Sequence, residues 1–260
     1  MGLKQKLAAG QVVRFFGLGT FLQPEWITLV GNLGGYDAVW LDDEHIGLNR
    51  RQVADAALAA RAAGLDSFVR LHASDYAKVM QPLEAGCTGI MAAQIHSAAE
   101  AEQVVRWAKF HPRGERGANG LNADNDFDAR PLRPYFAHAN ATTFIAIQIE
   151  NRAAVEDIAA IAAVPDVDVL FIGPADLSQS LGIPGDYGHP KLREAISRVA
   201  DVARQQRRPW SILPMDDPMA KWCLSLGCQG FLAGFDTPFI CHGVRAFQAN
   251  LPSVFTQAAR

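Results

Sequence analysis

Acidic side chains and a histidine gather in one short segment, Asp42-Asp43-Glu44-His45, directly after an apolar run. Carboxylates are costly to collect at one place unless a cation or a base makes use of them. A carboxylate that binds an imidazole fixes the tautomer of the ring and raises its basicity, so Asp42 and His45 form a candidate general base. The alternative is that His45 is only an exposed loop residue.

Two further carboxylates, Glu150 and Asp176, follow successive apolar runs, and Gln148 lies two residues before Glu150. Oxygen ligands of this kind suit a hard divalent cation such as Mg²⁺ or Mn²⁺, which keeps some waters and takes its other oxygens from a substrate. An alternative without a metal is that Glu150 pairs with Arg152 or Arg70, and that Asp176 caps the next helix.

Arg70 ends a third apolar run. An arginine in this position needs an anion, which could be a substrate carboxylate, a developing enolate, or the side chain of Glu44 or Glu150. We therefore treat Glu44, together with Arg70, as a candidate residue of a substrate site.

The segment 173–178, GPADLS, predicts a turn from a strand into a short helix. The first backbone N–H groups of a helix lack acceptors and can bind a small carboxylate or phosphate. Leu213-Pro214-Met215 and Ala233-Gly234-Phe235 are expected to form an apolar wall, and Leu213 is counted among the substrate-binding residues.

The elements that would position these residues are short apolar runs separated by amphipathic segments. Runs that are apolar on both faces are typical of strands buried in a parallel sheet. The predicted strands are 12–16, 38–41, 67–71, 89–93, 143–149, 169–172, 210–213 and 230–233, and the clearest helices are 52–63, 98–109, 153–163, 190–206 and 218–226. Candidate end signals are the helix N-caps Asn49 and Ser97, Pro190 in a first turn, and Gly64 and Gly227 after last turns.

Eight strand–helix units, with polar residues at the ends of successive strands, predict a single (β/α)₈ TIM barrel spanning residues 1–260. The segment 111–140 is rich in Gly, Asn, Asp, Arg and Pro and is predicted to be a long irregular loop. A C-terminal helix over 239–255 has spare apolar residues, Val244, Phe247, Leu251 and Phe255. They could serve an oligomer, or the helix could be the eighth helix of the barrel itself.

Composition argues against several classes of partner. The 260 residues are 49% apolar and 20% charged with a net charge of −3, and there is no basic run, which argues against nucleic acid or a membrane surface as partner. No stretch approaches the roughly 18 apolar residues of a membrane span, and the N-terminus lacks a signal-peptide core, so we expect a cytoplasmic protein. The four cysteines have no metal-binding spacing and are expected to be small buried side chains.

The ordered set of motifs resembles the class II pyruvate aldolases, the family of 4-hydroxy-2-oxoheptanedioate, 2-dehydro-3-deoxyglucarate and 2-keto-3-deoxy-L-rhamnonate aldolases. The resemblance covers nearly the whole chain, and it implies a barrel of the phosphoenolpyruvate/pyruvate type. The matching segments are Asp42-x-Glu44-His45, Arg70, Pro112-Arg113-Gly114-x-Arg116-Gly117, Gln148-Ile149-Glu150 and Gly173-Pro174-Ala175-Asp176-Leu177-Ser178.

The resemblance implies roles for these residues. Glu150 and Asp176 would hold a divalent cation, Mg²⁺, Mn²⁺ or Co²⁺, with Gln148 beside it. Pyruvate or hydroxypyruvate would chelate that cation, and its carboxylate would accept bonds from the N–H groups of Ala175 and Asp176. Arg70 would stabilise the enolate. His45, oriented by Asp42, would act as the base through a water on the metal.

The resemblance therefore predicts an aldehyde-lyase that makes or cleaves 4-hydroxy-2-oxo acids. Three further expectations accompany this hypothesis. Glu84 stands where the family often has an acidic residue that reaches the site of a neighbouring subunit, and the resemblance implies a homo-oligomer, a trimer or a hexamer. The polar segment 118–127 departs from the family pattern and could close over the site and change the acceptor aldehyde. No lysine ends a predicted strand, which disfavours Schiff-base chemistry.

Two other functions remain open from the sequence. One is a citrate-lyase-type enzyme on the same scaffold that acts on an acyl-coenzyme A thioester. Such an enzyme needs basic residues for the nucleotide phosphates, and the only cluster is Arg204, Arg207 and Arg208, which is expected at the wrong end of the barrel. The other is a barrel that binds a 2-oxo acid without catalysis, against which the intact set of candidate catalytic residues argues.

Overall fold

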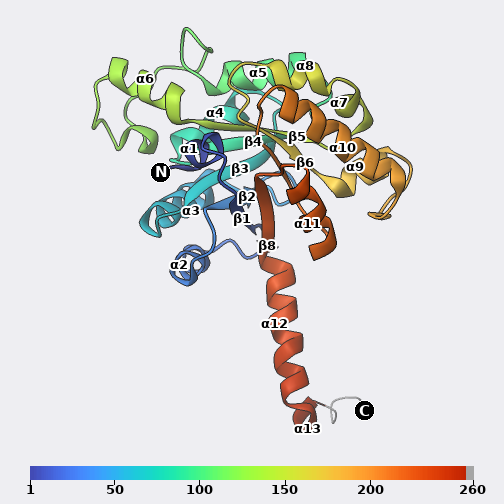
Figure 1. Ribbon diagram of the computed structural model, residues 1–260. Helices are drawn as coiled ribbons and strands as arrows, with labels where there is room; N and C mark the ends of the chain where they lie inside the picture. The colour runs from blue at the N-terminus through green and yellow to red at the C-terminus, as the bar shows by residue number, and fades with distance from the viewer. Residues whose placement is uncertain (256–260) are drawn as a thin grey trace.

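The computed structural model, which describes residues 1–255, is a closed barrel of eight parallel strands in the order in which they occur along the chain (Figure 1). Each strand pairs with the next, and β8 pairs with β1 to close the barrel. The TIM barrel predicted from the sequence is confirmed. The strands are β1 Val13–Leu18, β2 Ala38–Asp42, β3 Asp66–His72, β4 Gly89–Ala93, β5 Phe144–Ile149, β6 Val169–Ile172, β7 Trp210–Ile212 and β8 Gly230–Phe235.

Both faces of the strands are buried, which explains why their sequences do not alternate between apolar and polar residues. The inward side chains form one cluster rich in aromatic rings, including Phe15, Trp40, Phe68, Phe144 and Phe171. The outward side chains pack against the helices in a second, larger cluster. Leu3 and Leu7 of α1 Leu3–Ala8 join the inner cluster. They close the floor of the barrel, where the strands begin.

The predicted helices are present, with ends that follow the predicted signals. Asn49 forms a capping box with Gln52, and Ser97 accepts a hydrogen bond from the N–H of Glu100. The predicted helix 153–163 is two helices that meet at Asp157. The helices around the barrel are α2 Pro24–Leu33, α3 Arg50–Ala62, α4 Tyr76–Glu84, α5 Ala98–Ala108, α7 Arg152–Glu156, α8 Ile158–Ala163, α9 Pro174–Ser180, α10 Pro190–Gln205 and α11 Asp217–Ser225.

The segment 111–140 is less irregular than expected. It contains the 3₁₀ turn η1 Ala123–Asn125 and most of helix α6 Leu132–Thr142. Tyr135 and Ala139 of α6 are buried and pack with Phe110. The loop-like composition lies upstream of the helix, and it masked the helical spacing of these apolar residues.

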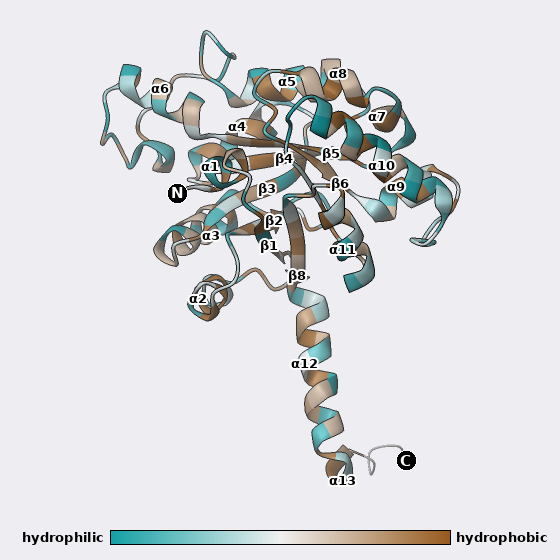
Figure 2. Ribbon diagram, viewed as in Figure 1, coloured by the Kyte–Doolittle hydropathy of each residue, from teal (hydrophilic) through white to brown (hydrophobic). Residues whose placement is uncertain are grey.

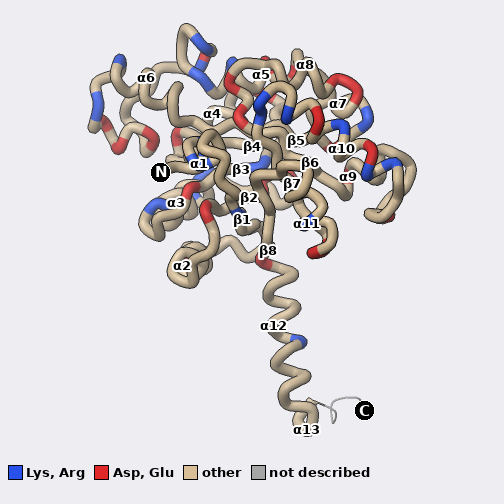
Figure 3. Tube along the Cα trace, viewed as in Figure 1, with Lys and Arg blue, Asp and Glu red and all other residues tan. Residues whose placement is uncertain are grey.

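The C-terminal helix leaves the barrel. Helix α12 Asp236–Asn250 runs away from the end of β8 and is followed by α13 Pro252–Phe255 (Figure 1). Near the start of α12, the ring of Phe239 meets Phe16 edge to face, with ring centroids 5.8 Å apart. Beyond that point apolar patches lie in the open along α12 (Figure 2), and the helix carries little charge (Figure 3). Three cysteines are buried as expected, but Cys241 on α12 is exposed.

Among residues 1–255, no helix has the length and apolar character needed to cross a membrane.

Candidate active site

The predicted site residues meet at one end of the barrel. Asp42 is the last residue of β2 and pairs in register with Arg70 of β3. Gln148 lies near the end of β5, Glu150 directly follows that strand, and Asp176 lies in the first turn of the helix after β6. Functional side chains of TIM barrels are found at this C-terminal end of the strands. The strand ends therefore bring together residues that are up to 134 positions apart in the sequence, from Asp42 to Asp176.

Arg70 is held on several sides. Its Nε and Nη2 donate to the two carboxylate oxygens of Asp42 at 3.1 and 2.7 Å, and Nε lies 3.3 Å from Oε2 of Glu44. The guanidinium carbon lies 4.8 Å from the ring centre of Trp40. Bidentate pairing with a carboxylate and stacking on an aromatic ring fix the plane of an arginine guanidinium. Arg70 is therefore a preorganised cation, and Glu44 is one of the two side chains that the sequence offered among its possible anions.

His45 is positioned differently from the expectation. The carboxylate of Asp42 accepts from the backbone N–H of His45 at 3.4 Å, while both of its oxygens bind Arg70. The carboxylate nearest the His45 ring is Glu44, whose Oε2 lies 3.9 Å from Nε2. The His45 side chain is 61% exposed at the mouth. Asp42 thus orients the loop that carries His45, and Glu44 connects the imidazole with Arg70.

Glu150 is a carboxylate in an unusual environment. It is 1% exposed, and it accepts hydrogen bonds from the backbone N–H of Gln94 at 2.7 Å and from the side-chain amide of Gln148. Burial raises the pKa of Glu150 to about 7, and the carboxylates of Glu44 and Asp176 add to the rise, whereas the Gln94 N–H and Arg70 oppose it. Glu150 is therefore not neutralised by an ion pair with Arg152 or Arg70.

Asp176 is close enough to Glu150 to raise its pKa. Helix α9 begins at Pro174 with Gly173 as its N-cap and no side-chain cap, so Asp176 does not cap a helix. The N–H groups of Ala175 and Asp176 lie in the first turn, where helical acceptors are lacking. A Cβ on Gly173 would lie 2.8 Å from Oε2 of Glu150, so glycine keeps the space beside this carboxylate open.

The donor set fits a divalent cation. Oε1 of Gln148 and Oε2 of Glu44 are buried and accept no hydrogen bond, although Oε2 of Glu44 is in an ion pair with Arg70. The side-chain amide of Gln148 binds Glu150, and the negative charge of Glu44 raises the pKa of Glu150. Within residues 1–255 there is no ready-made group of three or more His, Cys, Asp or Glu ligands. A cation would therefore take Glu150 and Asp176 from the chain and its other oxygens from water, substrate or Gln148, which is the pattern typical of Mg²⁺.

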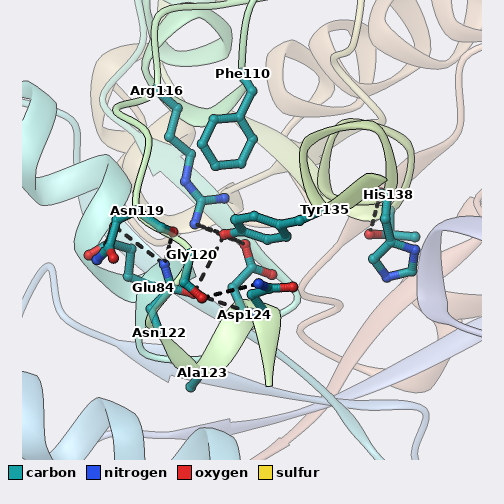
Figure 4. Close-up of polar contacts among 12 residues, drawn as sticks. Glu84, Phe110, Arg116, Asn119, Gly120, Asn122, Ala123, Asp124, Tyr135 and His138 are labelled. Atoms are coloured by element: carbon teal, nitrogen blue, oxygen red, sulfur yellow. Dashed lines mark hydrogen bonds and ion pairs between the residues drawn. The ribbon is translucent and has the colours of Figure 1, made fainter. Parts of the chain in front are cut away.

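The segment 118–127 does not close over the mouth. The N–H of Gly117 donates to the hydroxyl of Tyr76 at 2.6 Å at the start of α4, and the amide of Asn119 donates to Glu84 at 3.2 Å at its end. The segment therefore runs along the outside of α4 towards the floor of the barrel. Glu84, which the resemblance linked to a neighbouring subunit, is occupied here by Asn119 and Asn122 (Figure 4).

A buried ion pair anchors this segment. Nη2 of Arg116 lies 2.8 Å from Oδ2 of Asp124, and the hydroxyl of Tyr135 donates to the same carboxylate at 2.8 Å (Figure 4). The guanidinium of Arg116 also stacks on Phe110 at 4.6 Å. The Arg116 that matched the family motif therefore serves the packing of this segment within the chain.

Two neighbours of the site were not chosen from the sequence. Gln94 directly follows the predicted strand 89–93, and its backbone has a φ of 56° that presents its N–H to Glu150, a conformation that is uncommon for non-glycine residues. Trp40 was counted within a strand, although its ring supports Arg70. Neither a left-handed backbone at a glutamine nor the inward face of a tryptophan can be recognised from residue type alone.

Comparison with known proteins gives the family. Residues 23–243 match the model of the HpcH/HpaI aldolase/citrate lyase family. The chain belongs to this family. It is 31% identical over 242 residues to the hydroxypyruvate/pyruvate aldolase of Pseudomonas aeruginosa, which covers 93% of this chain and 89% of that protein. The resemblance to class II aldolases found in the sequence is confirmed, and the protein is an aldolase of the HpcH/HpaI family.

Solved structures of similar proteins agree with the barrel. The HpcH/HpaI aldolase from Desulfitobacterium hafniense has a TM-score of 0.88 at 32% identity, over 95% of this chain and 97% of that one. The citrate synthase SbnG has a TM-score of 0.87 at 28% identity, over 97% and 98% of the two chains. The same scaffold thus occurs in solved proteins that are named for different reactions.

Proposed function

We propose that this aldolase uses a divalent cation to form or cleave 4-hydroxy-2-oxo acids through the enolate of pyruvate or hydroxypyruvate. The observation that carries the proposal is the pair Glu150 and Asp176 beside a preorganised Arg70. The pKa of Glu150 is raised to about 7 by burial and by neighbouring carboxylates, so the site favours an added positive charge. When bound, the cation would polarise the ketone of the 2-oxo acid as a Lewis acid.

The residues of the chain would divide the reaction among them. The N–H groups of Ala175 and Asp176 would bind the carboxylate of the 2-oxo acid, and Gln148 would help to position it. His45 would accept the proton that leaves the methyl group of pyruvate or the hydroxymethyl group of hydroxypyruvate, and Arg70 would stabilise the negative charge that develops on the enolate oxygen. The enolate carbon then bonds to the aldehyde carbon, and the aldehyde oxygen takes up a proton. Cleavage is the reverse of these steps.

A lysine-based mechanism has no support in the structure. The six lysines lie within α1, α4, α10 and α11 or, for Lys109, directly after α5, and none ends a strand. A Schiff base needs an amine that reaches the substrate ketone.

The acyl-coenzyme A alternative is also disfavoured. Arg204, Arg207 and Arg208 line a cavity of about 560 Å³ at the floor of the barrel, next to the start of β7. This is the end opposite the site, as expected from the sequence. The cluster cannot bind the phosphates of a nucleotide whose thioester reaches Glu150.

The experiment that tests the proposal is turnover of pyruvate with an aldehyde before and after exhaustive chelation. We expect activity to vanish and to return with Mg²⁺, Mn²⁺ or Co²⁺. Glu150→Gln should prevent the cation from restoring activity. Glu156→Gln, a matched change on the exposed face of α7, should not. Full activity after chelation, or a covalent adduct trapped by borohydride, would overturn the proposal.

A further inference from the structure

The cavity at the floor of the barrel is basic. Its volume of about 560 Å³ lies within the range of small-molecule sites. It is enclosed by α1, the end of α10 and the residues that precede β6, β7 and β8. The charged residues that line it are Lys4, Arg204, Arg207, Arg208 and Asp168. None of them takes part in the proposed aldol reaction, whose residues lie at the opposite end of the strands.

Only two of the four cations are neutralised by a carboxylate. Nζ of Lys4 lies 3.0 Å from Oδ1 of Asp168, and Nη2 of Arg204 lies 2.6 Å from Oδ1 of Asp201. Within residues 1–255, the other two arginines of the cavity form no ion pair with an acidic side chain. The cavity therefore keeps a surplus of two positive charges.

Arg208 is fixed in place without being neutralised. Its Nε and Nη2 donate to the carbonyl oxygens of Ala162 and Val164 at 3.1 and 3.4 Å, and its Nη1 donates to that of Val167. These acceptors are uncharged, and they use three of the five N–H donors of the guanidinium. Burial lowers the pKa of Arg208, so a further negative charge beside it would be favourable.

Arg207 adds a guanidinium that has no partner. It follows Gln206, the C-cap of α10, and its φ of 53° is the left-handed conformation that glycine usually adopts after a helix. Its side chain is exposed, and in the part of the chain from 1 to 255 no carbonyl or carboxylate accepts a hydrogen bond from it. The donors of Arg207 can therefore bind a ligand in the cavity.

The remaining lining of the cavity is largely apolar. It consists mainly of Leu7, Ala8, Ala200, Ala203, Pro209, Trp210 and Leu226. A ligand that fits both parts has an anionic group for the arginines and a carbon skeleton for this wall. A phosphate monoester carries close to two negative charges at neutral pH, which matches the surplus, and its oxygens accept bidentate hydrogen bonds from guanidinium groups.

We propose that the floor cavity binds a small organic phosphate through Arg207 and Arg208, at a site separate from the active site. Arginine suits this role because its planar guanidinium matches the geometry of phosphate oxygens. The binding is non-covalent, and it does not depend on the aldol reaction.

The test is calorimetric titration with glycerol 3-phosphate at a fixed ionic strength of about 0.15 M, with glycerol as the uncharged control. We expect glycerol 3-phosphate to bind and glycerol not to bind. Saturating pyruvate and Mg²⁺ should leave the affinity unchanged. Absence of binding would overturn the inference, and so would displacement by pyruvate and Mg²⁺, which would place the phosphate at the mouth of the barrel.

Two arginines of α10 and its C-terminus distinguish a defined site from general attraction to positive charge. Arg207→Ala should weaken binding by about tenfold or more, because charge-assisted hydrogen bonds are lost. Arg193→Ala is the control. Arg193 lies in the first turn of α10, at the mouth end, where it stacks on Trp222 at 5.2 Å. This variant should bind like the wild type, and equal effects of the two substitutions would contradict the inference.

A third variant should increase the affinity. Asp201→Asn removes the carboxylate that neutralises Arg204, at a side chain that is 54% exposed, so we expect the fold to tolerate it. The cavity then has one more cation without a partner, and Kd for glycerol 3-phosphate should fall by about threefold. A purely structural role of these arginines would not produce tighter binding. An unchanged or higher Kd in the folded variant would reject the site.

Discussion

At the scale of single residues, the two central charges of the site differ in their partners. Glu150 is buried with hydrogen bonds but no cationic partner, whereas Arg70 has two carboxylates. The sequence located both residues at strand ends but could not assign their partners. Asp42 was expected at the imidazole of His45, and it binds Arg70 because these two residues are in register on neighbouring strands.

Glu150 should make cation binding depend on pH. Its pKa in the folded chain is about 7, so below that pH a bound proton competes with the cation. At a fixed concentration of Mg²⁺ or Mn²⁺, the cation should raise Tm relative to the cation-free protein. This difference in Tm should increase from about pH 5.5 to about 7.5 and then level off. Glu150→Gln should show little rise at any pH. A rise in Tm that is constant over this range would show that Glu150 is not a ligand.

Replacement of Arg70 should affect both turnover and stability. Arg70→Ala removes a preorganised charge and should reduce turnover by about 10²–10³. Because it also leaves Asp42 and Glu44 without their cation, we expect a loss of roughly 3–5 kcal/mol of unfolding free energy. Arg70→Lys keeps the charge and should restore most of the stability but little of the turnover. Arg51→Ala, in an exposed pair with Asp55, is the control for both measurements.

Near-wild-type turnover in a folded Arg70→Ala variant would contradict the role of Arg70 in stabilising the enolate. Equal recovery of stability and turnover in Arg70→Lys would mean that charge alone, without the paired geometry, is sufficient.

At the scale of elements, strands and regular helices were predictable because burial dictates their residue types. Both ends of each of the eight strands were predicted to within two residues, since both faces of the strands must be apolar. Helix α6 was missed because its buried residues follow a loop-like stretch, and the course of 118–127 along α4 depends on partners such as Glu84 that are distant in sequence.

The junction of α5 and α6 contains a buried lysine with a consequence for stability. Lys109 is completely buried and donates to the carbonyl oxygens of Asn140 and Thr143, both at 2.9 Å. Burial lowers the pKa of Lys109 to about 7, with a further contribution from nearby Lys4. Between about pH 7 and the unfolded value near 10.5, the unfolded chain binds more protons than the folded one, so this lysine makes stability rise with pH in that window.

Substitution of this lysine should remove that pH dependence. The unfolding free energy of the wild type relative to Lys109→Met should rise between about pH 7 and 10 by up to about 1.4 kcal/mol per pH unit. Lys191→Met, in the exposed first turn of α10, is the control. Chemical unfolding across this range provides the measurement, and a difference that is independent of pH would indicate that Lys109 is charged throughout.

At the scale of the whole molecule, α12 is the one long helix within residues 1–255 that does not lie along the barrel (Figure 1). Val244, Phe247 and Leu251 are 52%, 72% and 51% exposed, an apolar surface that the rest of the described chain does not cover. The sequence offered two explanations, an oligomer or the eighth helix of the barrel itself, and this position favours the oligomer.

We therefore predict a homo-oligomer that assembles through α12. Light scattering at micromolar concentration should give a multiple of the 28.2 kDa chain, with a trimer or hexamer expected from the resemblance. Phe247→Glu should shift the mass downwards, whereas Gln248→Glu, the same charge on the next residue of α12, should shift it less. A monomeric wild type, or equal effects of the two variants, would reject this role.

In the proposed reaction, His45 removes a proton from a pyruvate bound beside Glu150 and Asp176. The most direct measurement is exchange of the pyruvate methyl protons in heavy water, followed by NMR with a divalent cation and no aldehyde. We predict that His45→Ala slows exchange by about 10²–10⁴ while pyruvate still binds, and that His96→Ala, another exposed histidine beyond a strand end, exchanges like the wild type. Unchanged exchange in His45→Ala would contradict the account, because the base would then lie elsewhere.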